Sequence, residues 1–129
     1  MKYIEFGQNK TLVSNIVLGC MRIPKLSTDE VIKFLDTASS VGINMLDTAD
    51  VYSQGKSEEL LGEAFLKSKG MRERFFVQTK CGIRKNPHLY DFSKEHIINS
   101  VEGSLKRLKV DYIDSLILHR PDPLMEPEE

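Results

Sequence analysis

Four polar side chains stand at or just after the ends of apolar segments with strand character: Asp47, Tyr52, Lys80 and His119. In a barrel of alternating strands and helices, the catalytic groups come from the carboxyl ends of different strands. A cation beside a phenol favours the ionised phenol, and a carboxylate beside that cation holds it in place. We therefore expect Lys80, paired with Asp47, to make Tyr52 a usable acid near neutral pH. His119 could donate a hydrogen bond to the same substrate oxygen.

Each of these residues also has an ordinary structural interpretation. Asp47 could accept hydrogen bonds from backbone N–H groups, and Tyr52 could be a packed loop aromatic. Lys80 could be solvated, and His119 could bond to the loop that follows it. Their joint position at the ends of successive strands favours one shared site, because unrelated residues would not all choose the same end of a sheet.

The first third of the chain predicts a hairpin, a core strand and a helix. Residues 2–6 and 11–18 flank a polar turn, and the second arm is expected to run on into a core strand that ends near residues 19–21. A capping box at residues 27–30 starts the helix, which ends at Gly42. The apolar face of this helix consists of Val31, Ile32, Leu35 and Ala38.

The middle of the chain predicts a short strand at residues 43–46 and a second helix. Ser57 is the expected N-cap of this helix. Its expected core face consists of Leu60, Leu61, Ala64, Phe65 and Leu66.

A third strand is predicted at residues 75–79, followed by a loop at residues 81–91. Ser93 is the expected N-cap of a third helix, and residues 112–118 form a fourth strand. The apolar face of the third helix consists of Ile97, Ile98, Val101, Leu105 and Leu108.

Strict alternation of strands and helices predicts a parallel sheet with right-handed crossovers. The fold class is therefore α/β, with residues 1–129 as one domain. We expect the first half of a (β/α) barrel, about four βα units, with an N-terminal β-hairpin, because a closed barrel takes roughly 200 residues or more. Pro127 and its acidic neighbours predict the start of a fourth helix. We therefore expect the chain to be the front part of a longer protein.

Composition and charge exclude several classes of partner. The chain is 40% hydrophobic and 29% charged, with a net charge of -1, and its basic residues are scattered. These values predict a globular protein without a nucleic-acid or anionic-membrane surface. No apolar run is long enough for a signal peptide or for a membrane span of roughly 20 residues, so we expect a cytoplasmic protein.

The cysteines and the other two histidines do not predict a metal site. Cys20 and Cys81 lie far apart in the sequence and both follow strand-like segments, which predicts two reduced, half-buried thiols. His88 is in a polar loop and His96 is on a charged helix turn, so both are expected at the surface.

Several motifs resemble those of the aldo-keto reductase family. They are GINMLDTADVY at residues 42–52, GKSEELLG at residues 55–62, VQTK at residues 77–80 and LILHRPD at residues 116–122. The similarity covers essentially the whole chain from the hairpin onward. CGIR at residues 81–84, with HRPDP from His119, most resembles a bacterial predicted-oxidoreductase branch of the family.

This resemblance implies an NADPH-dependent reductase that converts small aldehydes or ketones to alcohols on a (β/α)8 barrel, with the N-terminal hairpin plugging its base. By motif match, Tyr52 would be the general acid, with Lys80 and Asp47 as the pair that tunes it. His119 would orient the substrate carbonyl, and the nicotinamide would supply the hydride.

The resemblance is less complete for the cofactor site. Relatives often have Gly-Thr-Trp after the first strand, where this chain has Gly19-Cys20-Met21. Cofactor contacts are expected from Cys20, Met21 and Arg22, together with Asp47. In the family, most cofactor contacts come from strands five to eight, which this chain lacks. We therefore expect this chain alone to be inactive.

Two other readings remain open. The family also includes non-catalytic regulatory subunits, so the chain could be an interaction protein. It could also be a self-sufficient four-stranded α/β domain without reductase function. In either case four parallel strands leave two open edges, which predicts self-association through those edges.

Overall fold

The computed structural model describes residues 1–120. The chain begins with an antiparallel hairpin of β1, Tyr3–Phe6, and β2, Thr11–Ser14. The next strand, β3, is Leu18–Gly19 and belongs to a different sheet. The expectation that the second hairpin arm runs on into the core strand is therefore wrong. The Ser14 N–H donates to Asn44 Oδ1 at 2.7 Å, so it bonds to a side chain instead of extending a strand ladder.

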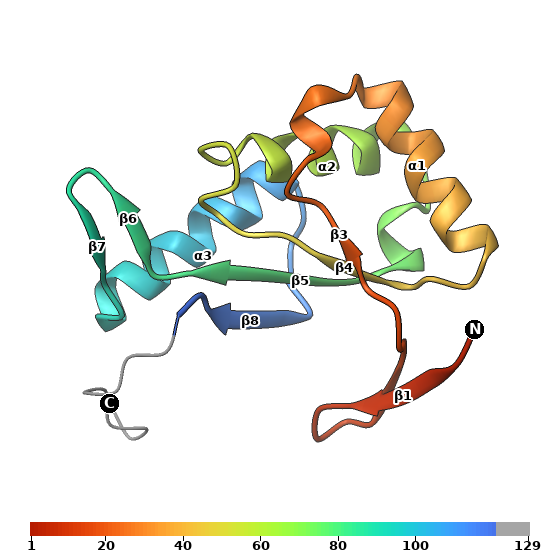
Figure 1. Cartoon of the computed structure of the whole chain (residues 1–129), viewed down its shortest axis with the longest axis horizontal. Helices are drawn as coiled ribbons and strands as arrows, with labels where there is room; N and C mark the ends of the chain where they lie inside the picture. The colour runs from red at the N-terminus through yellow and green to blue at the C-terminus, as the bar shows by residue number, and fades with distance from the viewer. Residues whose placement is uncertain (121–129) are drawn as a thin grey trace.

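The main sheet has four parallel strands in chain order: β3, β4 (Met45–Asp47), β5 (Phe76–Cys81) and β8 (Ser115–Leu118). The helices are α1 (Thr28–Ser40), α2 (Lys56–Lys67) and α3 (Lys94–Leu108), and they cover one face of this sheet (Figure 1). Two 3₁₀ turns, η1 (Ile23–Lys25) and η2 (Arg72–Arg74), precede α1 and β5. Because the strands are parallel, their carboxyl ends meet at one edge of the sheet.

Of the three helix starts predicted within residues 1–120, two are confirmed. Ser27 Oγ accepts from Glu30 N and the Glu30 carboxylate accepts from Ser27 N, which is a capping box. Ser93 Oγ accepts from the N–H of the third residue of α3. The predicted cap of α2 is wrong, because the N-cap is Gly55 and Ser57 lies inside the first turn.

Gly55 begins α2 for two physical reasons. Its φ of 87° lies in the left-handed region, which glycine adopts without strain. A Cβ at this position would also lie 2.7 Å from Arg107 Cδ, so the Arg107 side chain of α3 would have to shift to admit one. The left-handed backbone of Gly55, with Arg107 packed against it, therefore marks the start of α2.

The hydrophobic core lies between the sheet and the helices. Leu66 was expected in the core but is 68% exposed, and Ile98 is 46% exposed. Each of these two side chains therefore lies on the solvent side of its helix. The largest fully buried apolar side chains include Val13, Val31, Leu35, Leu46, Leu61, Met71, Val77 and Leu108.

The expected loop at residues 81–91 contains a second hairpin. Its strands are β6, Ile83–Lys85, and β7, His88–Tyr90, paired antiparallel. Charged and polar residues dominate this segment, which hid the strand signal. β5 ends at Cys81, two residues past the predicted end at Thr79, and β8 begins at Ser115 rather than at Tyr112. The helix start predicted at Pro127 lies outside the described residues.

None of the helices within residues 1–120 is long and apolar enough to cross a membrane.

Candidate active site

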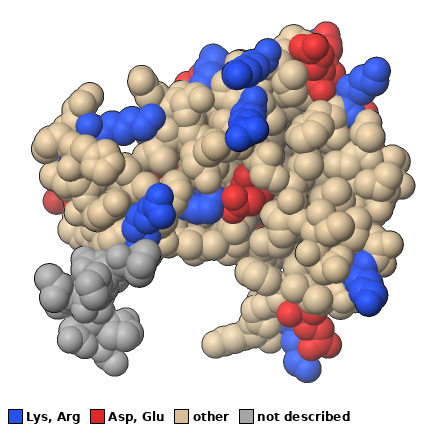
Figure 2. All heavy atoms as spheres, viewed as in Figure 1, with Lys and Arg blue, Asp and Glu red and all other residues tan. Residues whose placement is uncertain are grey.

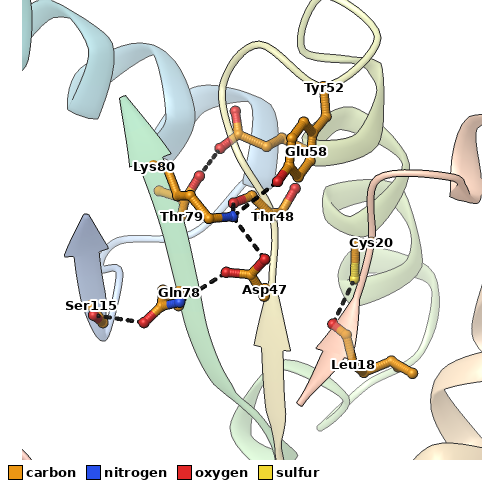
Figure 3. Close-up of polar contacts among 10 residues, drawn as sticks. All are labelled: Leu18, Cys20, Asp47, Thr48, Tyr52, Glu58, Gln78, Thr79, Lys80 and Ser115. Carbon is orange, nitrogen blue, oxygen red and sulfur yellow. Dashed lines mark hydrogen bonds and ion pairs between the residues drawn. The ribbon is translucent and has the colours of Figure 1, made fainter. Parts of the chain in front are cut away.

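Lys80 is the centre of a cluster at the carboxyl end of β5 (Figure 3). Its Nζ donates to Asp47 Oδ2 at 2.7 Å, to the Thr48 carbonyl oxygen at 2.8 Å and to Tyr52 OH at 3.1 Å. An ammonium group has three protons, so these acceptors use all of them. The phenol oxygen of Tyr52 is therefore an acceptor toward Lys80, which leaves its own proton free to be donated elsewhere.

Asp47 is held from both sides. Its Oδ1 accepts from Gln78 Nε2 at 2.8 Å, and Gln78 Oε1 accepts from Ser115 Oγ at 3.2 Å. These bonds form a row across β4, β5 and β8 (Figure 3). Sequence reasoning missed Gln78 and Ser115. Strand alternation would have placed Gln78 on the face of Lys80, two residues away, but nothing local indicates Ser115.

Tyr52 lies on the loop between β4 and α2. Its carbonyl oxygen accepts from Gly55 N at 3.2 Å and from Ser57 N at 3.4 Å, which ties the Tyr52 backbone to the start of α2. The Lys80 ammonium lies 4.9 Å from the centre of the Tyr52 ring. The phenol is thus positioned by a helix, and the lysine beside it by a strand.

His119 follows β8 and joins the same cluster. Its ring centre lies 5.6 Å from that of Tyr52, at an interplanar angle of 80°. Burial lowers the pKa of His119 below its usual range, and the charges of Lys80 and Arg120 act in the same direction. The imidazole is therefore neutral near pH 7, with one N–H to donate. The Nδ1 atom of His119 is buried and has no hydrogen-bond partner among the described residues.

The residues expected at the cofactor differ in exposure. Met21 and Arg22 are exposed, and they follow Cys20, whose N–H donates to the Asp47 carbonyl oxygen at 2.8 Å. This bond places the exposed pair at the end of the sheet where Asp47 lies. Cys20 is fully buried, and its Sγ donates to the Leu18 carbonyl oxygen. Its thiol therefore faces the interior, and the cofactor roles of these residues stay a prediction.

Within residues 1–120, no group of three or more His, Cys, Asp and Glu residues could hold a metal ion. Cys20 and Cys81 are free thiols, and both are buried rather than half-buried as expected. His88 is exposed as predicted, but His96 is partly buried, with Nε2 3.4 Å from Ser100 Oγ.

Charge on the face shown in Figure 2 is scattered and of both signs. One acidic and one basic group lie side by side in the hollow at the middle of this face. Several Lys and Arg side chains lie near one another at the upper middle of this face.

The model of the Aldo/keto reductase family matches residues 15–129. The oxidoreductase YcsN of Bacillus subtilis, itself described as uncharacterized, is 40% identical over 125 residues, which cover 89% of this chain and 42% of YcsN. A 6-dehydroglucose reductase of Novosphingobium aromaticivorans is 38% identical over 97% of this chain and 43% of its own length. This chain therefore spans less than half the length of these curated relatives.

Solved structures agree with the family match. An aldo-keto reductase from Pseudomonas aeruginosa superposes with a TM-score of 0.80 at 33% identity, covering 94% of this chain and 48% of that one. An aldo-keto reductase from Klebsiella pneumoniae in complex with NADPH has a TM-score of 0.75 at 28% identity, covering 94% of this chain and 40% of that one. The predicted α/β fold, a partial barrel with an N-terminal hairpin, is confirmed. This chain belongs to the aldo/keto reductase family.

Proposed function

We propose that this chain supplies the proton-transfer part of an NADPH-dependent reductase of aldehydes or ketones, with Tyr52 as the general acid. The observation that carries the proposal is the saturation of Lys80 by Asp47, Thr48 and Tyr52. A residue that donates a proton needs a stable anionic form, and the ammonium beside the phenol provides it.

The remaining residues would act on the substrate and on the lysine. Tyr52 would transfer its proton to the carbonyl oxygen of the substrate, and Lys80 would stabilise the phenolate left behind. Asp47, held by Gln78, would keep the ammonium in place. The neutral imidazole of His119 would donate its N–H to the same carbonyl oxygen and so orient it.

NADPH would bind along the exposed segment beside Asp47 and would supply the hydride when bound. Met21 and Arg22 would hold it together with Asp47. The complex of the Klebsiella relative with NADPH supports this cofactor. The 6-dehydroglucose reductase relative makes an oxidised sugar a reasonable first substrate to test.

A chimera tests the role of Tyr52. In it, this chain replaces the matching part of the Novosphingobium 6-dehydroglucose reductase, and reduction of 6-dehydroglucose is followed by NADPH absorbance. Tyr52→Phe should lower kcat by roughly 100-fold or more, the loss expected for a general acid. Tyr90→Phe is the matched control, because Tyr90 is an exposed residue of β7. A Tyr52→Phe chimera that binds NADPH and keeps its kcat would remove Tyr52 from the mechanism.

We further propose that the 129-residue chain alone does not turn over and self-associates. Among the described strands, β3 and β8 are the edges of the parallel sheet. Leu116 and Ile117 on β8 are 40% and 38% exposed, which leaves apolar surface beside an open edge. Steady NADPH oxidation by the chain would contradict the first statement, and a monomer in light scattering at all concentrations would contradict the second.

A further inference from the structure

Glu58 is a fully buried carboxylate on the helix side of β5, close to the cluster but not part of it. Its Oε1 accepts from Thr79 Oγ1 at 2.6 Å, and its Oε2 accepts from Arg107 Nε at 2.8 Å (Figure 3 shows the first bond). The Glu58 side chain is 0% exposed. A buried charge is costly unless it is both paired and hydrogen-bonded, so the three groups depend on one another.

Thr79 connects this carboxylate to Lys80. The two residues are neighbours on β5, and successive side chains of a strand point to opposite faces. Thr79 is fully buried against the helices, whereas Lys80 faces Asp47 and Tyr52. The bond from Thr79 to Glu58 therefore fixes the strand at the residue before Lys80.

Glu58 is also tied to Tyr52. It lies in the first turn of α2, and the N–H groups of Gly55 and Ser57 at the start of this helix donate to the Tyr52 carbonyl oxygen. These contacts form a closed loop. It runs from Tyr52 to the start of α2 and Glu58, and from Glu58 to Thr79 and Lys80. The 3.1 Å contact between Lys80 Nζ and Tyr52 OH closes it. Each step is a covalent link or a hydrogen bond.

Arg107 holds the far side of this arrangement. Its Nη2 donates to Ser104 Oγ within α3, and a Cβ at Gly62 would overlap the Arg107 carbonyl oxygen. α2 and α3 are therefore in close backbone contact where Arg107 reaches Glu58. The Glu58 carboxylate is therefore bonded to a side chain of α3 and to a side chain of β5.

We propose that Glu58 and Thr79 are positioning residues, whose hydrogen bond sets the contact between Lys80 and Tyr52. The catalytic meaning of this contact rests on the proposed function. The contact between Lys80 and Tyr52 does not depend on the proposed function, because it can be measured in the chain without cofactor or substrate. A purely structural role for the pair predicts a loss of stability with an unchanged Lys80 ammonium.

Hydrogen exchange of the Lys80 Nζ protons, measured by ¹H–¹⁵N NMR of the full chain, separates these two roles. Thr79→Val removes the hydroxyl donor and keeps the shape and the bond between Glu58 and Arg107. We expect exchange at Lys80 to become about tenfold faster, because loss of the bond to Glu58 releases β5 at the residue before Lys80 and so weakens the contacts of the ammonium. Thr79→Ser restores the hydroxyl and should restore slow exchange.

The matched control is Thr28→Val. Thr28 Oγ1 donates to Glu63 Oε2 at 2.8 Å, so this variant removes a similar bond between α1 and α2, away from Lys80. Exchange at Lys80 should stay as in the unaltered chain. Asp47→Asn is the positive control, because it removes a direct acceptor of the ammonium.

Unchanged exchange at Lys80 in folded Thr79→Val, with faster exchange in Asp47→Asn, would overturn the proposal. If Thr79→Val does not fold, Glu58→Gln takes its place, because it keeps the side-chain shape and weakens the acceptor. Unchanged exchange in that variant would overturn the proposal equally. A Tyr52→Phe chimera that binds NADPH and keeps its kcat would count against the proposed function only.

Discussion

Removal of the Asp114 carboxylate should destabilise the chain far more than removal of a similar carboxylate at the surface. Asp114 Oδ2 accepts from Arg72 Nη2 at 2.7 Å and from Val77 N at 2.7 Å, at the amino end of the contact between β5 and β8. The Arg72 side chain is only 10% exposed and the Asp114 side chain only 20%. Asp114 counted with its backbone is exposed to solvent. Asp114→Ala removes the carboxylate partner of the Arg72 guanidinium, which keeps only backbone carbonyl acceptors, and leaves the Val77 N–H without its acceptor.

The magnitude follows from this burial. Removing one partner of a buried pair costs about 3–5 kcal/mol, and the partial exposure of Asp114 reduces this to about 2.5 kcal/mol. With a urea slope of roughly 1.5 kcal/mol per molar, the midpoint should fall by roughly 1.7 M. The control is Asp36→Ala, which removes an exposed pair with Arg74 at the same kind of distance, 2.6 Å. An exposed pair contributes about 0–1 kcal/mol, so that midpoint should fall by roughly 0.3 M.

Urea unfolding of both variants, followed by circular dichroism, measures the difference. Equal midpoint shifts would refute the argument that burial decides the strength of these pairs. The result also bears on the site, because this pair sets the β5–β8 register that places Lys80 opposite Ile117 and His119 just beyond.

Two further predictions concern groups whose pKa burial raises. Burial and the charge of Glu58 raise the pKa of Asp50 from 3.8 to about 6. The free energy of unfolding should therefore fall as pH rises from about 4 to about 6. Asp50→Asn should remove this pH dependence. It should also raise the free energy of unfolding by about 1 kcal/mol at neutral pH, after allowance for the partial exposure of Asp50. Equal slopes in urea titrations of the two proteins would contradict this. Burial also raises the pKa of Cys20 to about 12 and that of Cys81 to about 11, so a thiol reagent at mildly alkaline pH should label neither in the folded chain and both in urea. Rapid labelling of either thiol in the folded chain would show that it is accessible.

Predictions from local patterns were the most accurate. The capping box of Ser27 and Glu30 was confirmed because both bonds join residues three positions apart. The cap predicted at Ser57 was wrong because the left-handed Gly55 is the N-cap of α2, with Arg107, 52 positions away in the sequence, packed against it. The hairpin of β6 and β7 was missed because its charged residues carry no strand signal.

The sequence by itself determined the alternation of strands and helices, the parallel sheet and the strand ends that carry Asp47, Lys80 and His119. These features depend on side-chain periodicity and on hydrogen bonds between near neighbours, which are properties of short segments. Only the tertiary structure decided that Gln78 holds Asp47 and that Glu58 lies behind Lys80 against Thr79. Buried polar groups need partners, and those partners lie 31 and 21 positions away, where only the folded chain brings them within bonding distance.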